Sequence, residues 1–174
     1  MTKPSPYSPF DALSDAYETM YEHVARGLDK AKDKTGSVIN ELVDEAEEKI
    51  TDLEDITEED AKKLATWLRR DLDDAINYVA ETEYALTDWL GFETALIKAS
   101  FINAMLETAD PTTLALLRMK ENAHKPYVYH TGEVTGVGTL ICDECGEKVH
   151  FHEAAKIPPC PKCHETSFHR IQID

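Results

Sequence analysis

Apolar residues recur every third or fourth position over much of the chain, a spacing that places them on one face of a helix. This pattern predicts a first helix over about 9–34 and a second over 37–54, after a break at Gly36-Ser37. A third is expected over 58–87, where Thr57–Asp60 forms a capping sequence. The three inward stripes contain Phe10, Leu13, Tyr17, Met20, Tyr21, Val24, Leu28 and Ala31, then Ile39, Leu42, Val43, Ala46, Ile50 and Leu53, then Ala61, Leu64, Ala65, Leu68, Leu72, Ala75, Ile76 and Val79.

A later stretch, 84–109, is apolar on two faces. One face carries Trp89, Phe92, Leu96, Ala99, Ile102 and Leu106, and the other carries Leu90, Ile97, Phe101 and Met105. Such a helix is central to a bundle or lies in an interface; central burial is favoured, and homo-oligomer formation through 84–109 is the alternative. Helices are expected over 89–109 and 111–121. Residues 1–124 are therefore predicted to form an elongated antiparallel helical bundle with coiled-coil-like character.

Residues 125–174 follow a different pattern. Lys125-Pro126 ends the helical periodicity, and the segments Tyr127–Tyr129, Lys148–His152 and Ser167–Ile171 have the composition and alternation of strands. The chain is thus predicted to be mainly α. An acidic helical domain precedes residue 125, and a small β domain with a leading strand segment follows it.

Four cysteines of this β domain form two pairs, Cys142-x2-Cys145 and Cys160-x2-Cys163. In each pair a tight turn directs backbone amides at the thiolates, so that two pairs complete a tetrahedral site with metal–sulfur distances of about 2.3 Å for zinc. A metal also stabilises a unit of about 30 residues that cannot bury enough surface alone. The spacing predicts a zinc ribbon with one structural Zn²⁺. Four thiolates leave no open position for water, so hydrolytic chemistry is not expected.

Iron is the alternative metal at the same cysteines. These pairs also describe rubredoxin-type iron electron transfer, and a helical domain followed by such a site is the layout of rubrerythrin. A di-iron bundle needs two Glu-x-x-His motifs and two further glutamates that project inward. The helical region has one such motif, at Glu121 and His124. A rubredoxin-type iron site without the di-iron centre therefore stays as the alternative.

The formal net charge is −16, and most of the acidic excess lies in the helical region. Such a surface repels a phosphate backbone and attracts basic partners, so nucleic-acid binding by the helices is not expected. Single-strand binding by the ribbon is the remaining nucleic-acid alternative, with Phe151 and Phe168 as stacking groups. The cations available to it are Lys148, Lys156, Lys162 and Arg170.

Four histidines also lie in the β domain: His150, His152, His164 and His169. Their pattern is typical of a solvent-exposed face and assigns them no role. A second metal site or a proton-sensitive patch is the alternative, because histidine titrates near neutral pH.

Other sequence features limit the function classes. No run approaches the roughly 18 apolar residues of a membrane span, and residues 1–10 show no signal-peptide pattern. We therefore expect a cytoplasmic protein without a membrane partner, whose reduced thiols bind a metal instead of forming disulfides. The acidic runs are typical of a solvated face, and no catalytic constellation is discernible. The sequence predicts a non-enzymatic adaptor or regulatory protein with an unidentified protein partner.

The segment 128–145, VYHTGEVTGVGTLICDEC, resembles the approach to the ribbon in the YbeL-like bacterial zinc-ribbon-containing proteins. That family also has an acidic helical region with a tract like Leu68–Leu72 and a second knuckle like Cys160–Cys163. The resemblance covers most of the chain. It implies a cytoplasmic zinc-binding protein with the four cysteines as ligands, and it implies no activity. His164 departs from the glycine that often follows a knuckle, which makes that turn less typical without removing a ligand.

Overall fold

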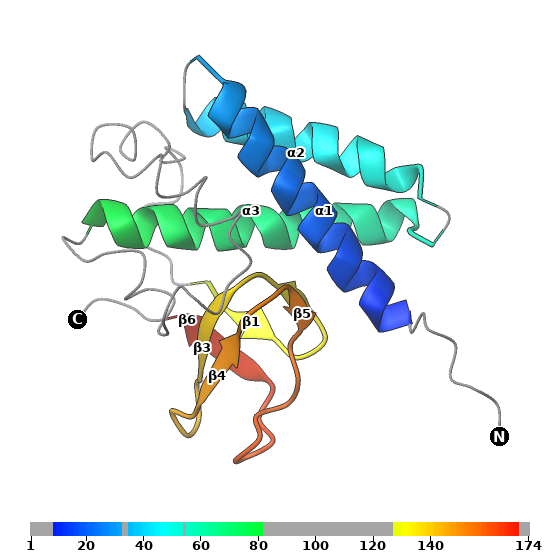
Figure 1. The fold of residues 1–174 in the computed structure, drawn as a ribbon. Helices are drawn as coiled ribbons and strands as arrows, with labels where there is room; N and C mark the ends of the chain where they lie inside the picture. Colours follow the sequence, from blue (N-terminus) through cyan, green and yellow to red (C-terminus); the bar gives the residue numbers. More distant parts are fainter. Residues whose placement is uncertain (1–8, 33–34, 54, 82–126, 171–174) are drawn as a thin grey trace, which may run out of the picture.

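Three helices lie together at the start of the fold, and a small sheet packs against them. The computed structural model describes residues 9–32, 35–53, 55–81 and 127–170. The helices are α1 (Pro9–Lys30), α2 (Gly36–Thr51) and α3 (Glu58–Glu81). In Figure 1, α1 crosses α3 obliquely, α2 lies above α3, and the sheet lies below it. The prediction of a helical region followed by a small β structure is confirmed.

The strands form two antiparallel sheets. They are β1 (Tyr129–His130), β2 (Val134–Thr135), β3 (Gly138–Cys142), β4 (Lys148–Phe151), β5 (Ala155–Lys156) and β6 (Ser167–Arg170). One sheet has the order β1-β6-β3-β4, and β2 pairs with β5 in the other. In the register of β3 and β6, Leu140 lies opposite Arg170 and Cys142 lies opposite Phe168. These side chains share one face of the sheet because strand residues two apart point the same way.

Several helix ends differ from the sequence prediction. The expected break between the first two helices is present, but it lies before Gly36 and does not include Gly36-Ser37. Thr35 caps α2 by accepting a hydrogen bond from the Val38 amide at 3.4 Å, which makes Gly36 the first helical residue. The helix expected over 9–34 ends at Lys30, and the one expected over 37–54 ends at Thr51. Leu53, predicted to point inward, is consequently outside the helix and 46% exposed.

Other predicted boundaries are confirmed or fall beyond the description. The Thr57 hydroxyl caps α3 by accepting a hydrogen bond from the Asp60 amide at 3.1 Å, as predicted. The helices expected over 89–109 and 111–121, the two-faced stretch 84–109 and the boundary near residue 125 lie outside the described residues. Coiled-coil character and the division into domains therefore stay predictions. No described helix combines the length and apolar character needed to cross a membrane.

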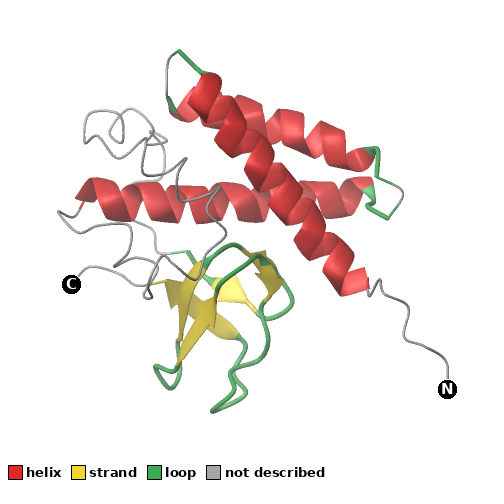
Figure 2. Cartoon of the chain, viewed as in Figure 1, coloured by secondary structure: helices red, strands yellow, loops and turns green. Residues whose placement is uncertain are grey.

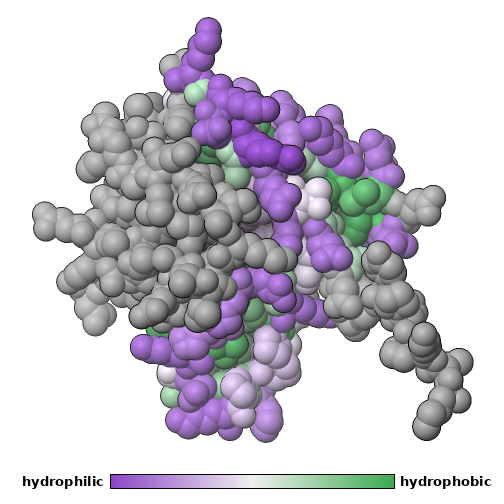
Figure 3. Space-filling model, viewed as in Figure 1, coloured by the Kyte–Doolittle hydropathy of each residue, from purple (hydrophilic) through white to green (hydrophobic). Residues whose placement is uncertain are grey.

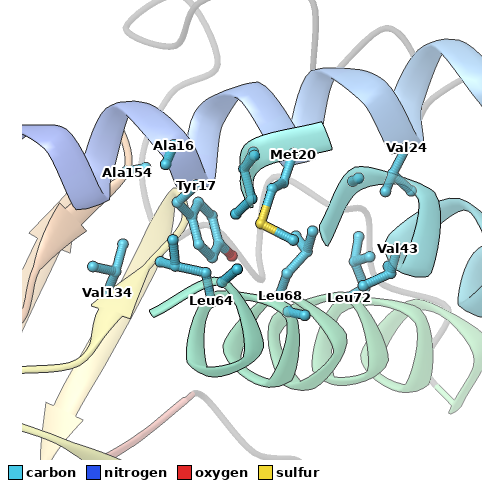
Figure 4. Packing of buried hydrophobic residues seen from close by; sticks show 14 of the residues in the cluster. Ala16, Tyr17, Met20, Val24, Val43, Leu64, Leu68, Leu72, Val134 and Ala154 are labelled. Carbon is cyan, nitrogen blue, oxygen red and sulfur yellow. The ribbon is translucent and has the colours of Figure 1, made fainter. Parts of the chain in front are cut away.

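The predicted apolar stripes form the helical core. Tyr17 and Met20 of α1 and Leu64 and Leu68 of α3 are fully buried (Figure 4). This core does not end at the helices, because Val134 of β2 and the nearby Ala154 belong to the same cluster. A second cluster fills the ribbon and consists of Tyr129, Leu140, Cys142, Phe151, Ile157, Cys160 and Phe168. The ribbon thus has a core of its own and also contributes to the helical one.

The acidic residues of α3 do not all face solvent. The prediction of a solvated acidic face holds for Glu58 and Glu59 at the start of the helix, which are exposed. It was wrong for Asp71 and Asp73, which are 4% and 2% exposed. Their carboxylates are covered because the ribbon packs on this part of α3 and provides hydrogen-bond donors to them.

Candidate metal centre

Two loops at one end of the ribbon carry the four cysteines. Cys142 is the last residue of β3, and Cys145 lies in the turn that leads to β4. Cys160 and Cys163 lie in the connection between β5 and β6. Figures 1 and 2 show both loops at the end of the ribbon that is far from the helices. Antiparallel pairing of β3 with β4 and β6 brings the two loops together.

The four sulfur atoms have the spacing of a tetrahedral metal site. All four Sγ atoms lie within 4.8 Å of one another. The Cys142–Cys163 pair is separated by 3.5 Å and the Cys145–Cys160 pair by 3.6 Å. A zinc–sulfur distance of about 2.3 Å places tetrahedral sulfurs about 3.8 Å apart, so the four thiols fit around one ion. All four are free of disulfide bonds.

The two cysteine turns have the same backbone structure. The Gly146 amide donates to the Cys142 carbonyl at 3.0 Å, and the His164 amide donates to the Cys160 carbonyl at 2.9 Å. The residue after each second cysteine is left-handed, with φ of +71° at Gly146 and +63° at His164. His164 therefore completes the turn in place of glycine, in a conformation that is less favourable for a residue with a Cβ.

Local hydrogen bonds favour a thiolate at Cys160. Burial of this thiol opposes ionisation. The amides of Cys163 and Lys162 donate to it, and neighbouring thiols add further hydrogen bonds, so the pKa of Cys160 falls to about 6. At Cys163 the Glu165 amide favours the thiolate, but burial and the three other sulfurs outweigh it and raise the pKa to about 12. Metal binding must therefore release protons, and metal affinity should rise with pH.

The histidines of the ribbon have separate surroundings. His169 of β6 pairs with Asp143 of the first cysteine turn, with 2.5 Å between Nδ1 and Oδ1. His150 contacts the Thr139 hydroxyl at 2.8 Å. Within the described residues, the four cysteines are the one group of three or more candidate ligands close enough to hold a metal ion. The structure therefore does not join the histidines to a second metal cluster there.

The sequence predicted that the four cysteines lie together, but it did not predict the contacts that hold the first cysteine turn in place. The Asp143–His169 pair ties the first cysteine turn to the last strand, and the Asp143 amide also donates to the Ser167 carbonyl at 3.1 Å. Neither contact has a sequence signal, because both depend on the register between β6 and the turn. These bonds orient the turn from outside the ligand set, as is common around metal sites.

Comparison with known proteins agrees with this architecture. Residues 26–172 match a family described as a zinc-ribbon containing domain. Relatives from Escherichia coli strains K12, O6:H1 and O157:H7, each named "Uncharacterized protein YbeL", are 29% identical over 136 residues, which is 76% of this chain and 81% of theirs. No solved structure gives a significant match. Because the family match includes most of the helical region and the whole ribbon, the chain belongs to the zinc-ribbon containing domain family, with YbeL-like bacterial relatives.

Proposed function

We propose that this chain is a non-enzymatic, zinc-binding adaptor or regulatory protein of the cytoplasm. One structural Zn²⁺ is bound by Cys142, Cys145, Cys160 and Cys163 and stiffens the end of the ribbon. That end contacts a protein partner. The observation that carries the proposal is the cluster of four thiols at the ribbon end far from the helices, in a chain of the zinc-ribbon family.

A structural role follows from the ligand set. Four thiolates complete the coordination of zinc, so no position is left for a substrate or a reactive water. The backbone amides of the cysteine turns favour the thiolates, and the Asp143–His169 pair fixes the first turn. Iron in the same four-sulfur site is the alternative, and metal analysis of the purified protein distinguishes the two metals.

The helices offer a second surface to a partner. Exposed acidic residues lie at i, i+3, i+4 and i+7 along α2, at Glu41, Asp44, Glu45 and Glu48. Figure 3 shows hydrophilic residues over most of the visible surface of the described helices. Such a surface attracts a basic partner. We also propose that the helical region is an elongated bundle. Self-association through 84–109 is a further hypothesis.

Partner capture from cells, followed by mass spectrometry, tests the role of the ribbon end. The Cys160→Ser/Cys163→Ser variant removes two proposed ligands. The Glu144→Lys/Lys162→Glu variant swaps two exposed charges in the cysteine loops and leaves all ligands in place. Metal content is measured on each protein.

A specific partner that is captured by wild type and lost with both variants supports the ribbon end as the contact surface. If only the cysteine variant loses the partner, the metal contributes by keeping the ribbon folded. If both variants retain all partners, the ribbon is not the contact surface. Glu41→Gln/Glu48→Gln then tests the acidic face of α2.

A further inference from the structure

Asp71 of α3 is the centre of a buried polar contact between the helices and the ribbon. Its Oδ2 atom accepts hydrogen bonds from the Tyr17 hydroxyl at 2.5 Å, the Thr135 hydroxyl at 3.1 Å and the Gly136 amide at 2.9 Å. Arg170 of β6 forms an ion pair with it at 3.8 Å. One carboxylate therefore connects α1, α3, β2 and β6.

Two arginines also connect α3 with the ribbon, Arg70 from the helix and Arg170 from β6. Arg70 of α3 forms an ion pair with Glu133, and its guanidinium lies 3.9 Å from the centre of the Tyr129 ring. Arg170 belongs to the ribbon and is 3% exposed. Its Nη2 donates to the Thr135 hydroxyl at 2.7 Å, and its Nε donates to the Tyr129 hydroxyl at 3.2 Å.

Tyr129 connects this network to the cysteines. Its hydroxyl donates to Asp74 of α3, and its fully buried ring lies in the ribbon core with Cys142, Cys160 and Phe168. Phe168 lies opposite both Tyr129 and Cys142 in the sheet. One short span of packed side chains thus lies between the cysteines and α3.

The energetics make the two parts depend on each other. A ribbon of this size needs its metal to stay folded. If the ribbon opens, Asp71 loses the hydrogen bonds from Thr135 and Gly136 and the ion pair with Arg170, and only Tyr17 still donates to its Oδ2 atom. The contact between α1 and α3 at this carboxylate is then held by fewer bonds and is open to water. The helical core also loses Val134 and Ala154.

We infer that metal binding at the ribbon end and the packing of α1 against α3 are thermodynamically coupled through Asp71, Arg170 and Tyr129. The packing of the helices therefore depends on whether the ribbon has bound its metal. The inference rests on the metal-binding part of the proposed function and not on the adaptor role.

Hydrogen exchange of the full-length protein, measured by mass spectrometry with zinc bound and after chelation, tests the coupling. We expect chelation to speed exchange in α3 peptides over 64–76 by about tenfold or more, along with ribbon peptides over 138–151. Tyr129→Phe removes the hydroxyl between Asp74 and Arg170 and should shrink the metal-dependent change in α3. Glu59→Gln breaks only the exposed Glu59–Lys63 pair of α3 and should leave that change intact.

Three other results overturn the inference. Faster exchange confined to the ribbon, with α3 unchanged, means that the ribbon opens alone. If chelation speeds exchange in α3 equally in Tyr129→Phe and in wild type, the Tyr129 hydroxyl does not carry the coupling. A protein that binds no metal refutes the metal-binding premise as well, and metal analysis identifies that case separately. No partner is used, so failure of the adaptor proposal does not affect the test.

Discussion

Replacing Asp74 by Asn isolates one largely buried carboxyl at the contact between α3 and the ribbon. Burial raises the pKa of Asp74 from 3.8 to about 6, although the Tyr129 hydroxyl and the cations Arg170 and Arg70 partly oppose the rise, and Asp71 adds to it. Because the folded-state pKa is raised, the protonated form favours folding. The stabilisation is complete below the unfolded-state value and is lost as the pH rises through about 6.

The size of this effect follows from the two pKa values. Raising a pKa from 3.8 to about 6 corresponds to about 3 kcal/mol between the protonated and ionised forms. Asparagine resembles the neutral carboxyl and can still accept the Tyr129 hydrogen bond. We therefore expect Asp74→Asn to match wild type near pH 4 and to exceed its free energy of unfolding by up to about 3 kcal/mol near pH 8.

Urea unfolding followed by circular dichroism across this pH range, with the metal kept saturating, measures the difference between the two proteins. Taking the difference removes the titration of groups that both proteins share. Tyr129→Phe provides a second check, because losing a donor to the carboxylate should move the fall in stability to higher pH. Parallel curves for wild type and Asp74→Asn would refute the raised pKa.

Three further predictions concern the cysteine turns, the ion pair between Asp71 and Arg170, and the helical core. His164→Gly should stabilise the zinc-loaded ribbon by about 1 kcal/mol, because φ at this position is +63°. Gly146→Ala should destabilise it by a similar amount, because φ is +71°; its added Cβ meets no atom within 4 Å, so the loss comes from backbone strain alone. Thermal unfolding checks both variants, and melting temperatures equal to that of wild type would contradict the strain argument. Arg170→Leu should cost about 3 kcal/mol by leaving the Asp71 ion pair incomplete, measured by urea unfolding; a loss near zero would mean that the pair adds nothing. Leu64→Ala should cost about 2–5 kcal/mol, whereas Leu53→Ala at an exposed site should change stability by less than about 0.5 kcal/mol; similar losses would contradict the burial assigned to the two residues.

The parts of the fold that local rules control could be predicted from the sequence. The apolar period identified Tyr17, Met20, Leu64 and Leu68 as core residues, because helix geometry alone sets which side chains share a face. Cysteine spacing likewise brought the four thiols together, since each turn is formed within a few residues. Leu53 shows the limit of the method, because the same period could not locate the end of α2.

The contact between α3 and the ribbon could not be predicted in this way. Asp71 looked like part of a solvated acidic face, but its partners Tyr17 and Thr135 lie 54 and 64 residues away in sequence. No periodicity encodes which distant donors will cover a carboxylate. For the polar residues inside the tract Leu68–Leu72, the sequence offers only a family resemblance. The structure gives a physical reason, because Arg70 pairs with Glu133 of the ribbon and Asp71 accepts a hydrogen bond from the Gly136 amide.

The position of that contact explains how so small a ribbon can be held in one orientation. Strand β3 ends at Cys142 near the cysteine loops, with Phe168 of β6 opposite it, and β6 ends at Arg170 in the buried network with α3. A metal bound by the four cysteines would therefore fix one end of these strands, and the helices fix the other. A flexible link would let the cysteine loops sample many directions, whereas two fixed ends hold them in a set relation to the acidic face of α2. The proposed adaptor role, in which one partner is bound through both surfaces, would gain from this rigidity, because preorganisation lowers the entropy lost on binding.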